Sequence, residues 1–358
     1  MEHRDYLYLL GAMPDASPLL LRRLLALYGS PEAVFRQESL PVSPVRQAAM
    51  EQLKKGAAAL LKKRDEAEAA GIRWVSFEEE DYPDRLRPLG DAPLGMFVKG
   101  KMPPEGRPSV GIVGARGCTP YGKMMAERFG GELGEKGIAV ISGMARGIDG
   151  HAQEAALKRG GASFGVLGCG ADVCYPAHHR RLYEALGEQG GILSEYPPGT
   201  PPLPHHFPLR NRLIAALSDV LLVIEAREKS GSLITVDLAL EQGKDVLALP
   251  GRVGDALSAG CLGLIRQGAG VLTCCGDVYE LLGMEAGGGE EPGNPERREK
   301  LSPELKQIWR HMGTDPVHIE DLMAEEEDLS MGELSLRLLE LERRGYIRQT
   351  AGGGYLKM

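Results

Sequence analysis

Two glycine-rich turns, each carrying an arginine, are the part of this sequence best suited to binding chemistry. The first is GARGCT at 114–119 and the second is SGMARGID at 142–149. Each turn follows an apolar run and precedes a helix-compatible run, so unpaired backbone N–H groups and the positive end of a helix dipole point at one spot. Arg116 and Arg146 add permanent charges and forked donors that fit phosphate oxygens. The pattern predicts a phosphate-binding crevice.

Three further turns, each after a predicted strand or at a helix start, are also rich in donors, namely GCGADVCYP at 168–176, FPLRNR at 207–212 and EKSGSLIT at 228–235. Five such turns exceed what a single pyrophosphate requires, and they indicate a ligand with several phosphates in a row. The five turns contribute basic side chains, hydroxyl groups and glycines that allow close backbone approach. These are Arg116, Arg146, Arg210, Arg212, Lys229, Thr119, Ser142, Ser230, Ser232, Gly114, Gly143 and Gly231.

The catalytic alternatives are weaker. Glu195 and Glu225 end predicted strands, where they could act as acid and base or could orient the crevice arginines, and the sequence leaves both interpretations open. Asp149 is expected to cap its own helix. No nucleophile elbow or Walker lysine motif occurs. The sequence therefore offers a binding site without an evident catalytic apparatus.

Histidine and cysteine spacing predicts neither a metal nor a cofactor. His151, His178, His179, His205 and His206 lack a metal-ligand spacing and are expected to be polar surface or crevice residues. The six cysteines lack a C-x-x-C pair and are expected to be small core residues in a reducing compartment.

Length and composition predict a multidomain α/β protein. The 358 residues suit two or three domains, and 43% of them are hydrophobic. No apolar run approaches the ~18 to 20 residues that span a bilayer, and the N-terminus lacks a basic region followed by a long apolar one. We therefore expect a cytoplasmic protein that has no membrane partner.

The net charge of −8 is unevenly distributed. Residues 1–106 carry 15 basic and 16 acidic groups, residues 107–283 carry 17 and 18, and residues 284–358 carry 10 and 16. The negative excess lies mainly in the tail, so a polyanion would have to bind a local patch in the middle of the chain.

The elements that position the turns follow from hydrophobic patterning. Residues 1–70 form an expected helical domain, and 71–100 add strands near 73–76 and 94–99. From 108 to 282, runs rich in Val, Ile and Leu alternate with helical runs, which is typical of a buried, mostly parallel sheet. We expect one Rossmann-like, doubly wound domain over 71–283, whose ligands bind beyond the carboxyl ends of the strands.

The last part of the chain divides into a linker and a small domain. Residues 284–300 are rich in Gly, Glu and Pro, which predicts a linker. Residues 301–358 show helical pieces and a final two-stranded segment with a glycine turn, which predicts a winged helix.

Seven sequence blocks follow one another in the central domain, namely VGARGCTPYG, SGMARGID, GVLGCGADVCYP, ILSEYPPGTPP, FPLRNRLIAALSDVLLVIEA, SGSLITVDLALEQGKDVLALPG and LIRQGA. In this order and spacing they resemble the DNA processing protein A (DprA/Smf) family. The N-terminal helices also resemble that family's helix-hairpin-helix or sterile-alpha-motif-like segment, and the tail resembles its winged helix. The resemblance implies a homodimer that binds single-stranded DNA and loads the recombinase RecA onto incoming strands during natural transformation. It implies no enzymatic activity.

By position, the resemblance assigns DNA contacts to arginines in three turns and to two residues after the Tyr-Pro pair. These are Arg116, Arg146, Arg210, Arg212, His179 and Arg180, and Asn211 lies between two of them. Phe207, beside the FPLRNR arginines, is the best-placed residue for base stacking. Two positions depart from the family pattern: Gln153 replaces a usual histidine and Leu262 a usual asparagine. Crevice or dimer contacts at these two positions are expected to differ.

The charge of the C-terminal tail bears on its role. The tail has six excess acids and a third helix of mixed charge, so we expect it to contact protein or to be autoregulatory rather than to read DNA.

The rival function is a phosphoribohydrolase-like enzyme that processes a free nucleotide with Glu195 or Glu225. Against it, Pro250 and Gly251 are followed by RVGDALS instead of the P-G-G-x-G-T signature of such enzymes.

Overall fold

The computed structural model describes residues 1–13, 16–285, 301–313, 315–326, 329–350 and 353–357. The described chain forms two compact units, a large one made mainly of residues up to 284 and a small one made mainly of the tail.

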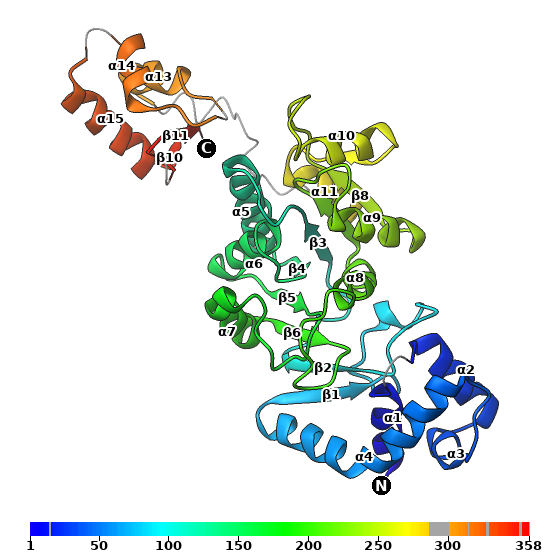
Figure 1. Cartoon of the computed structure of the whole chain (residues 1–358). Coiled ribbons are helices and arrows are strands. Elements are labelled where there is room, and N and C mark those ends of the chain that lie inside the picture. The colour runs from blue at the N-terminus through cyan, green and yellow to red at the C-terminus, as the bar shows by residue number, and fades with distance from the viewer. Residues whose placement is uncertain (14–15, 286–300, 314, 327–328, 351–352, 358) are drawn as a thin grey trace. The chain divides into compact units, whose positions relative to one another are not determined.

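A nine-stranded sheet organises the described part of the large unit (Figure 1). Its order is β1-β2-β6-β5-β4-β3-β7-β8-β9. In this spatial order, all neighbouring strands from β6 through β3 to β9 pair in parallel. Strand β2 pairs antiparallel with both β1 and β6. The strands are β1 (Ile72–Ser76), β2 (Gly95–Gly100), β3 (Ser109–Val113), β4 (Ala139–Ser142), β5 (Ser163–Val166), β6 (Gly191–Ser194), β7 (Val220–Val223), β8 (Asp245–Ala248) and β9 (Gly270–Val271). The predicted mostly parallel sheet is confirmed.

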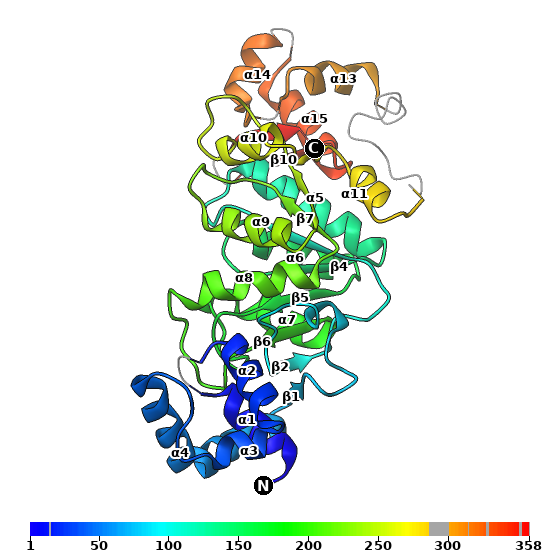
Figure 2. The ribbon, with the colours of Figure 1, turned by 90° about the vertical axis from the view of Figure 1, so that its right-hand side faces the viewer.

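Helices cover both faces of this sheet. They are α5 (Pro120–Glu135), α6 (Ile148–Lys158), α7 (Arg180–Gln189), α8 (His206–Leu217), α9 (Gly231–Glu241), α10 (Ala259–Arg266) and α11 (Cys275–Leu281). In Figure 1, α6 and α7 lie on one side of the strands and α8 and α9 on the other. Figure 2, viewed from that second side, shows α8 and α9 in front of the sheet. Every residue of β3, β4 and β7 is buried, as expected for strands covered on both faces.

The chain order places a topological switch point between β3 and β7. From β3 the chain moves outward through β4, β5 and β6, then returns through α8 to place β7 on the other side of β3. The loops that leave β3 and β7 therefore diverge to opposite faces, which leaves a crevice between them at the carboxyl edge.

The N-terminal helices share a hydrophobic core with the first strands. They are α1 (His3–Gly11), α2 (Pro18–Tyr28), α3 (Pro31–Arg36) and α4 (Pro44–Ala69). Ser17 caps the N-terminus of α2, because Leu20 N donates to Ser17 Oγ at 3.3 Å. The ring of Tyr8 on α1 lies 5.5 Å from that of Trp74 on β1 and 5.9 Å from that of Phe97 on β2. The predicted boundary near residue 70 thus separates helices from sheet strands, but the two share one continuous hydrophobic core.

One strand is shorter than the hydrophobic pattern predicts. Within the alternating region from 108 to 282, the run VLTCC at 271–275 also predicts a strand, but β9 covers only Gly270–Val271. The next residues begin α11 instead, because Asp277 Oδ2 accepts from Thr273 N at 2.6 Å and from Cys274 N at 3.0 Å. This local capping competes with strand pairing.

The small unit has the expected winged-helix order. It contains α13 (Pro303–Arg310), α14 (Ile319–Glu325), α15 (Met331–Arg343) and the antiparallel pair β10 (Ile347–Gln349) and β11 (Tyr355–Lys357). Leu334, Leu338 and Leu341 on α15 are buried at helical spacing against the other two helices. Among all the described helices, none combines the length and apolar character needed to cross a membrane.

Candidate functional site

The two arginine turns cross each other at the carboxyl edge of the sheet. Ile148 N donates to Ala115 O at 3.2 Å, which joins the turn after β4 to the turn after β3. Gly147 makes this crossing possible: its φ is 76°, and a Cβ there would lie 2.2 Å from Ala115 O. Arg116 and Arg146 are both exposed on these turns. The structure therefore brings together the two arginines predicted to form the site.

The turn after β7 lies against the same place. Ile224 N donates to Val113 O at 3.2 Å, and a Cβ on Gly114 would lie 3.0 Å from Glu225 O. Lys229 is exposed farther along this turn, and Ser230 caps α9 by accepting from Ser232 N at 3.4 Å. The end of β7 thus meets the first predicted turn at the switch point, and the fifth predicted turn follows directly along the chain.

Aromatic rings extend the site beside Arg116. The guanidinium carbon of Arg116 lies 5.8 Å from the ring centre of Phe207, and the Tyr175 ring lies 5.4 Å from the same ring. Tyr175 is 40% exposed, which leaves part of its ring available for stacking. Tyr175 was missed in the sequence, although the Tyr-Pro pair that ends the third turn was visible.

Arg210 has a different environment from Arg116. It is 4% exposed, and its Nη1 donates to Gly143 O at 3.0 Å and also to Val166 O. Burial lowers the pKa of its guanidinium to about 10, against the opposing effect of Asp149, so the group stays protonated at neutral pH. A Cβ on Gly143 would lie 2.7 Å from Arg210 Nη2, which explains the glycine. Arg210 ties α8 to the turns after β4 and β5.

Arg212 is held in an ion-pair network. Its Nη2 lies 2.6 Å and its Nη1 3.0 Å from the carboxylate oxygens of Glu195, and its Nε lies 2.8 Å from Asp91 Oδ2. Burial opposes the charge on Arg212, but Glu195 outweighs it and raises the pKa of the guanidinium. Of the two interpretations left open for Glu195, the geometry matches that of a partner that orients an arginine. The resemblance assigns DNA contacts to Arg210 and Arg212 as well as to Arg116 and Arg146, but the guanidinium groups of Arg210 and Arg212 are engaged by these internal partners.

Two other predicted residues of the second turn face inward. Ser142 is fully buried, and its Oγ donates to Ile112 O at 2.6 Å. Asp149 was expected to cap its own helix, but it does not. The N-cap residue of α6 is Gly147, and no side chain donates or accepts a capping hydrogen bond there. Instead, Asp149 Oδ2 accepts from Gly143 N at 3.1 Å. Burial raises the pKa of this carboxyl group, and Arg210 opposes that shift.

Gln153 supports the same turn from α6. Its Oε1 accepts from Met144 N at 3.1 Å, and its Nε2 donates to Phe164 O at 3.1 Å. Met144 is buried and has a φ of 53°, an uncommon conformation outside glycine. A histidine can also offer one donor and one acceptor, so this departure preserves the support of the turn.

The remaining predicted residues lie at the borders of the site. Arg180 is exposed, and its Nε donates to Glu184 Oε1 at 2.7 Å. His179 is half-buried beside Met144 O. Asn211 Nδ2 donates to Gly231 O at 3.4 Å, and Thr119 Oγ1 accepts from Gly122 N at 3.0 Å. In the described part of the chain, no group of three or more His, Cys, Asp or Glu side chains could hold a metal ion.

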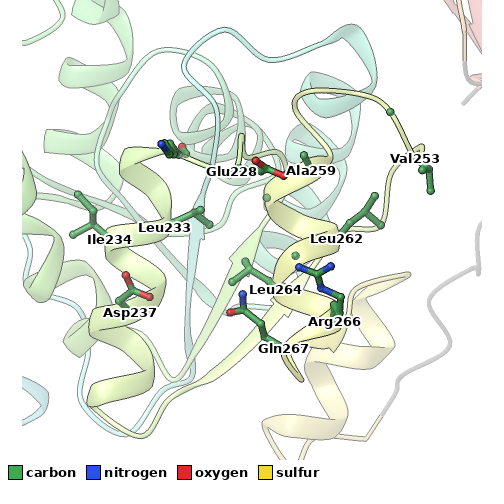
Figure 3. A pocket seen from close by; sticks show the side chains of 15 residues that line it. Glu228, Leu233, Ile234, Asp237, Val253, Ala259, Leu262, Leu264, Arg266 and Gln267 are labelled. Carbon is green, nitrogen blue, oxygen red and sulfur yellow. The ribbon is translucent and has the colours of Figure 1, made fainter.

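A groove of about 760 Å³ lies between α9 and α10 (Figure 3), and Lys229 and Ser230 of the fifth predicted turn belong to its lining. Leu233 and Ile234 line it from α9, and Leu262 and Arg266 line it from α10. Val253, on the loop that leads into α10, is 95% exposed at its rim. Leu262, the second departure from the family pattern, therefore belongs to this groove.

Comparisons with known proteins agree on one family. The family model of DNA recombination-mediator protein A matches residues 73–283, and a DprA winged-helix model matches 292–353. The chain is 38% identical to Protein Smf of Escherichia coli over 286 residues, covering 78% of this chain and 76% of that protein. It is 43% identical to DNA processing protein DprA of Streptococcus pneumoniae over 203 residues, covering 57% and 72%.

Two solved structures are also similar. The DNA processing protein A of Streptococcus pneumoniae superposes with a TM-score of 0.67 at 34% identity, over 78% of this chain and 98% of that one. DNA processing protein A of Helicobacter pylori has a TM-score of 0.53 at 30% identity, over 59% and 96%, and its study describes a single-stranded DNA binding mode.

Proposed function

Because the chain belongs to the DNA recombination-mediator protein A family, we propose that its crevice binds the phosphate backbone of single-stranded DNA. The observation that carries this proposal is the crossing of the two turns that expose Arg116 and Arg146. Two permanent charges on adjoining glycine turns, with backbone N–H groups beside them, suit successive phosphates. The single-stranded DNA binding mode described for the Helicobacter pylori relative supports the same ligand.

Bases are held by stacking rather than by edge-specific hydrogen bonds. Phe207 and Tyr175 provide adjoining rings beside Arg116. Stacking tolerates any base, so sequence preference is slight. Unpaired bases can reach such rings, whereas those in a duplex remain stacked on their neighbours.

The protein acts as a mediator that protects incoming strands and loads RecA during natural transformation, as a cytoplasmic homodimer without enzymatic activity. Glu195, one of the two possible acid–base residues, is engaged with Arg212, which weighs against the phosphoribohydrolase alternative. The groove between α9 and α10 supports protein contacts. Ile234 and Val253 are 39% and 95% exposed there, and exposed apolar side chains at a hollow favour a protein partner.

The winged helix contacts protein rather than DNA. Leu336 and Leu339 on α15 are 68% and 62% exposed. They lie opposite the buried stripe of Leu334, Leu338 and Leu341, on the face that a DNA-reading winged helix turns toward bases. Leucines cannot satisfy the hydrogen-bonding groups of the major groove.

The test is a titration of labelled oligothymidine of increasing length, beside a duplex of equal length. We expect affinity for single strands to grow with length until the crevice is filled, and to exceed affinity for the duplex. A phosphoribohydrolase would instead gain nothing beyond one nucleotide and would release base from a nucleoside monophosphate. RecA loading is tested separately by filament growth on protein-coated single strands, which the mediator should accelerate.

A further inference from the structure

Four histidines form two matched pairs beside the crevice turns. The ring centres of His178 and His179 are 4.5 Å apart with planes at 80°, and those of His205 and His206 are 4.5 Å apart at 75°. His178 and His205 are exposed, while His179 is half-buried and His206 is buried. Each pair therefore has an outer, solvent-facing ring and an inner, supported one.

The inner ring of each pair is anchored to a crevice turn in the same way. His179 Nδ1 lies 3.2 Å from Met144 O, in the turn that carries Arg146. His206 Nδ1 lies 3.2 Å from Gly168 O, in the third turn. A carbonyl oxygen only accepts, so Nδ1 carries the hydrogen in both rings and Nε2 is where a further proton binds.

Burial favours the neutral form of the inner rings in the free protein. Burial lowers the pKa of His179, and His178 adds to this effect, while the contact with Met144 O and the carboxylates of Glu154 and Asp149 on α6 oppose it. A Cβ on Gly150, in the first turn of α6, would lie 2.6 Å from His179 Cε1, so this ring also sits against the positive end of a helix.

His206 has comparable surroundings. Burial lowers its pKa, His205 adds to this, and Gly168 O and the carboxylate of Glu195 oppose it. Tyr196 stacks on the ring at 4.0 Å. A phosphate placed beside either pair would add a strong negative charge and favour the imidazolium form.

We propose that the two histidine pairs, His178–His179 and His205–His206, are proton-linked phosphate contacts of the crevice. Each pair takes up a proton when a strand phosphate binds beside it, so binding tightens as the pH falls. The pairs border the places where phosphate is expected, since His179 contacts the Arg146 turn and His206 precedes Phe207, the ring beside Arg116. The inference rests on the proposed binding of single-stranded DNA, and it adds that proton uptake controls the affinity.

The affinity for oligothymidine, measured by fluorescence anisotropy at constant ionic strength, provides the first test. Neither thymine nor the phosphodiester titrates between about pH 6 and about pH 8, so pH dependence in this range comes from the protein. Each linked proton strengthens binding by up to about tenfold per pH unit. We expect affinity at about pH 6 to exceed that at about pH 8 by at least about tenfold.

The whole protein loses negative charge as the pH approaches its isoelectric point near 5.6, and this alone strengthens binding to a polyanion. Histidine variants are therefore needed to separate the effect of the two pairs from this general effect of charge. The combined His178→Asn, His179→Asn, His205→Asn and His206→Asn variant keeps an amide donor near each Nδ1 position but cannot be protonated. Its affinity ratio between the two pH values should fall to about threefold or less. The matched control, His3→Asn with His318→Asn, should keep the ratio of the unaltered protein.

Calorimetry on the unaltered protein gives a second measurement that needs no variant. Binding heats in buffers of different ionisation enthalpy at about pH 6.5 should reveal net proton uptake. If the strand binds without proton uptake, the inference is overturned. It is also overturned if the four-histidine variant binds and keeps the affinity ratio of the unaltered protein between the two pH values. Absence of binding at every pH instead overturns the proposed function. If the four-histidine variant does not fold, a double variant of the two exposed rings, His178→Asn with His205→Asn, takes its place. The ratio of its affinities at the two pH values should be smaller than that of the unaltered protein, and an unchanged ratio contradicts the inference.

Discussion

Arg212 and Glu195 form a largely buried ion pair, with 2.6 Å between Nη2 and Oε2 and with side chains 8% and 12% exposed. The pair joins α8 to the loop after β6. Arg212 also contacts Asp91, which lies before β2, so one guanidinium group links three segments that are distant in the sequence. This arginine stabilises the edge of the crevice.

Arg212→Ala is therefore expected to lower the free energy of unfolding by about 3–5 kcal/mol, because it leaves a buried carboxylate without its partner. Urea denaturation measures the loss. Adding Glu195→Gln should restore part of it, since the second change removes the uncompensated charge. A loss below about 1 kcal/mol for Arg212→Ala would show that the pair is not important for stability.

Phe207→Leu is expected to weaken binding of single-stranded DNA by about 1–2 kcal/mol, or about 5- to 30-fold, because leucine keeps apolar bulk but offers no ring for a base. Phe207→Tyr serves as the matched control and should bind like the unaltered protein. Anisotropy titration with oligothymidine measures both variants. Equal affinity of the leucine and tyrosine variants would exclude stacking on this residue.

Deleting residues 284–358 is expected to leave affinity for single-stranded DNA within about twofold, because the exposed face of α15 is apolar and the tail carries an acidic excess. The same anisotropy titration applies to the shortened protein. A large loss of affinity would mean that the tail contributes to the strand-binding surface. Deletion is preferable to point changes here because it removes every tail contact at once.

The stability of the protein is expected to fall as the pH drops from about 7 to about 5, partly through His206. Burial lowers the pKa of this ring in the folded state, so below the unfolded value of about 6.5 the unfolded chain binds more protons. The contribution is fully present above that pH and is lost below it. Urea midpoints across this range should fall less steeply for His206→Asn, and parallel curves would contradict the assignment.

Much of the framework was predictable because its causes are local. Runs of Val, Ile and Leu without alternation predicted the buried strands, and a glycine turn after each run predicted where the crevice lies. The structure exposes Arg116 and Arg146 on these turns, which is compatible with the phosphate-binding role predicted for them. The family motifs and the winged-helix order were also correctly identified.

The environments of Arg210 and Arg212 were not predictable from the same sequence. RNR at a helix start suggests an open basic cluster, whereas the groups that occupy these arginines come from residues remote in the chain. Gly143 and Val166 accept from Arg210, and Glu195 accepts from Arg212. Asp149 was misassigned for a similar reason, since its partner Gly143 lies in the preceding turn rather than in its own helix. Burial of a charge depends on tertiary contacts that no local pattern specifies.

The most direct test of the account compares three arginine variants in binding to oligothymidine over a range of salt concentrations. Arg116→Ala and Arg146→Ala should each weaken binding about tenfold or more and reduce the slope of log affinity against log salt by about one. Arg107→Ala is the control, because Arg107 is also exposed but lies just before β3, at the opposite end of that strand from Arg116. Its affinity and salt slope should equal those of the unaltered protein. Unchanged affinity in both Arg116→Ala and Arg146→Ala would contradict the proposal that this crevice binds the strand.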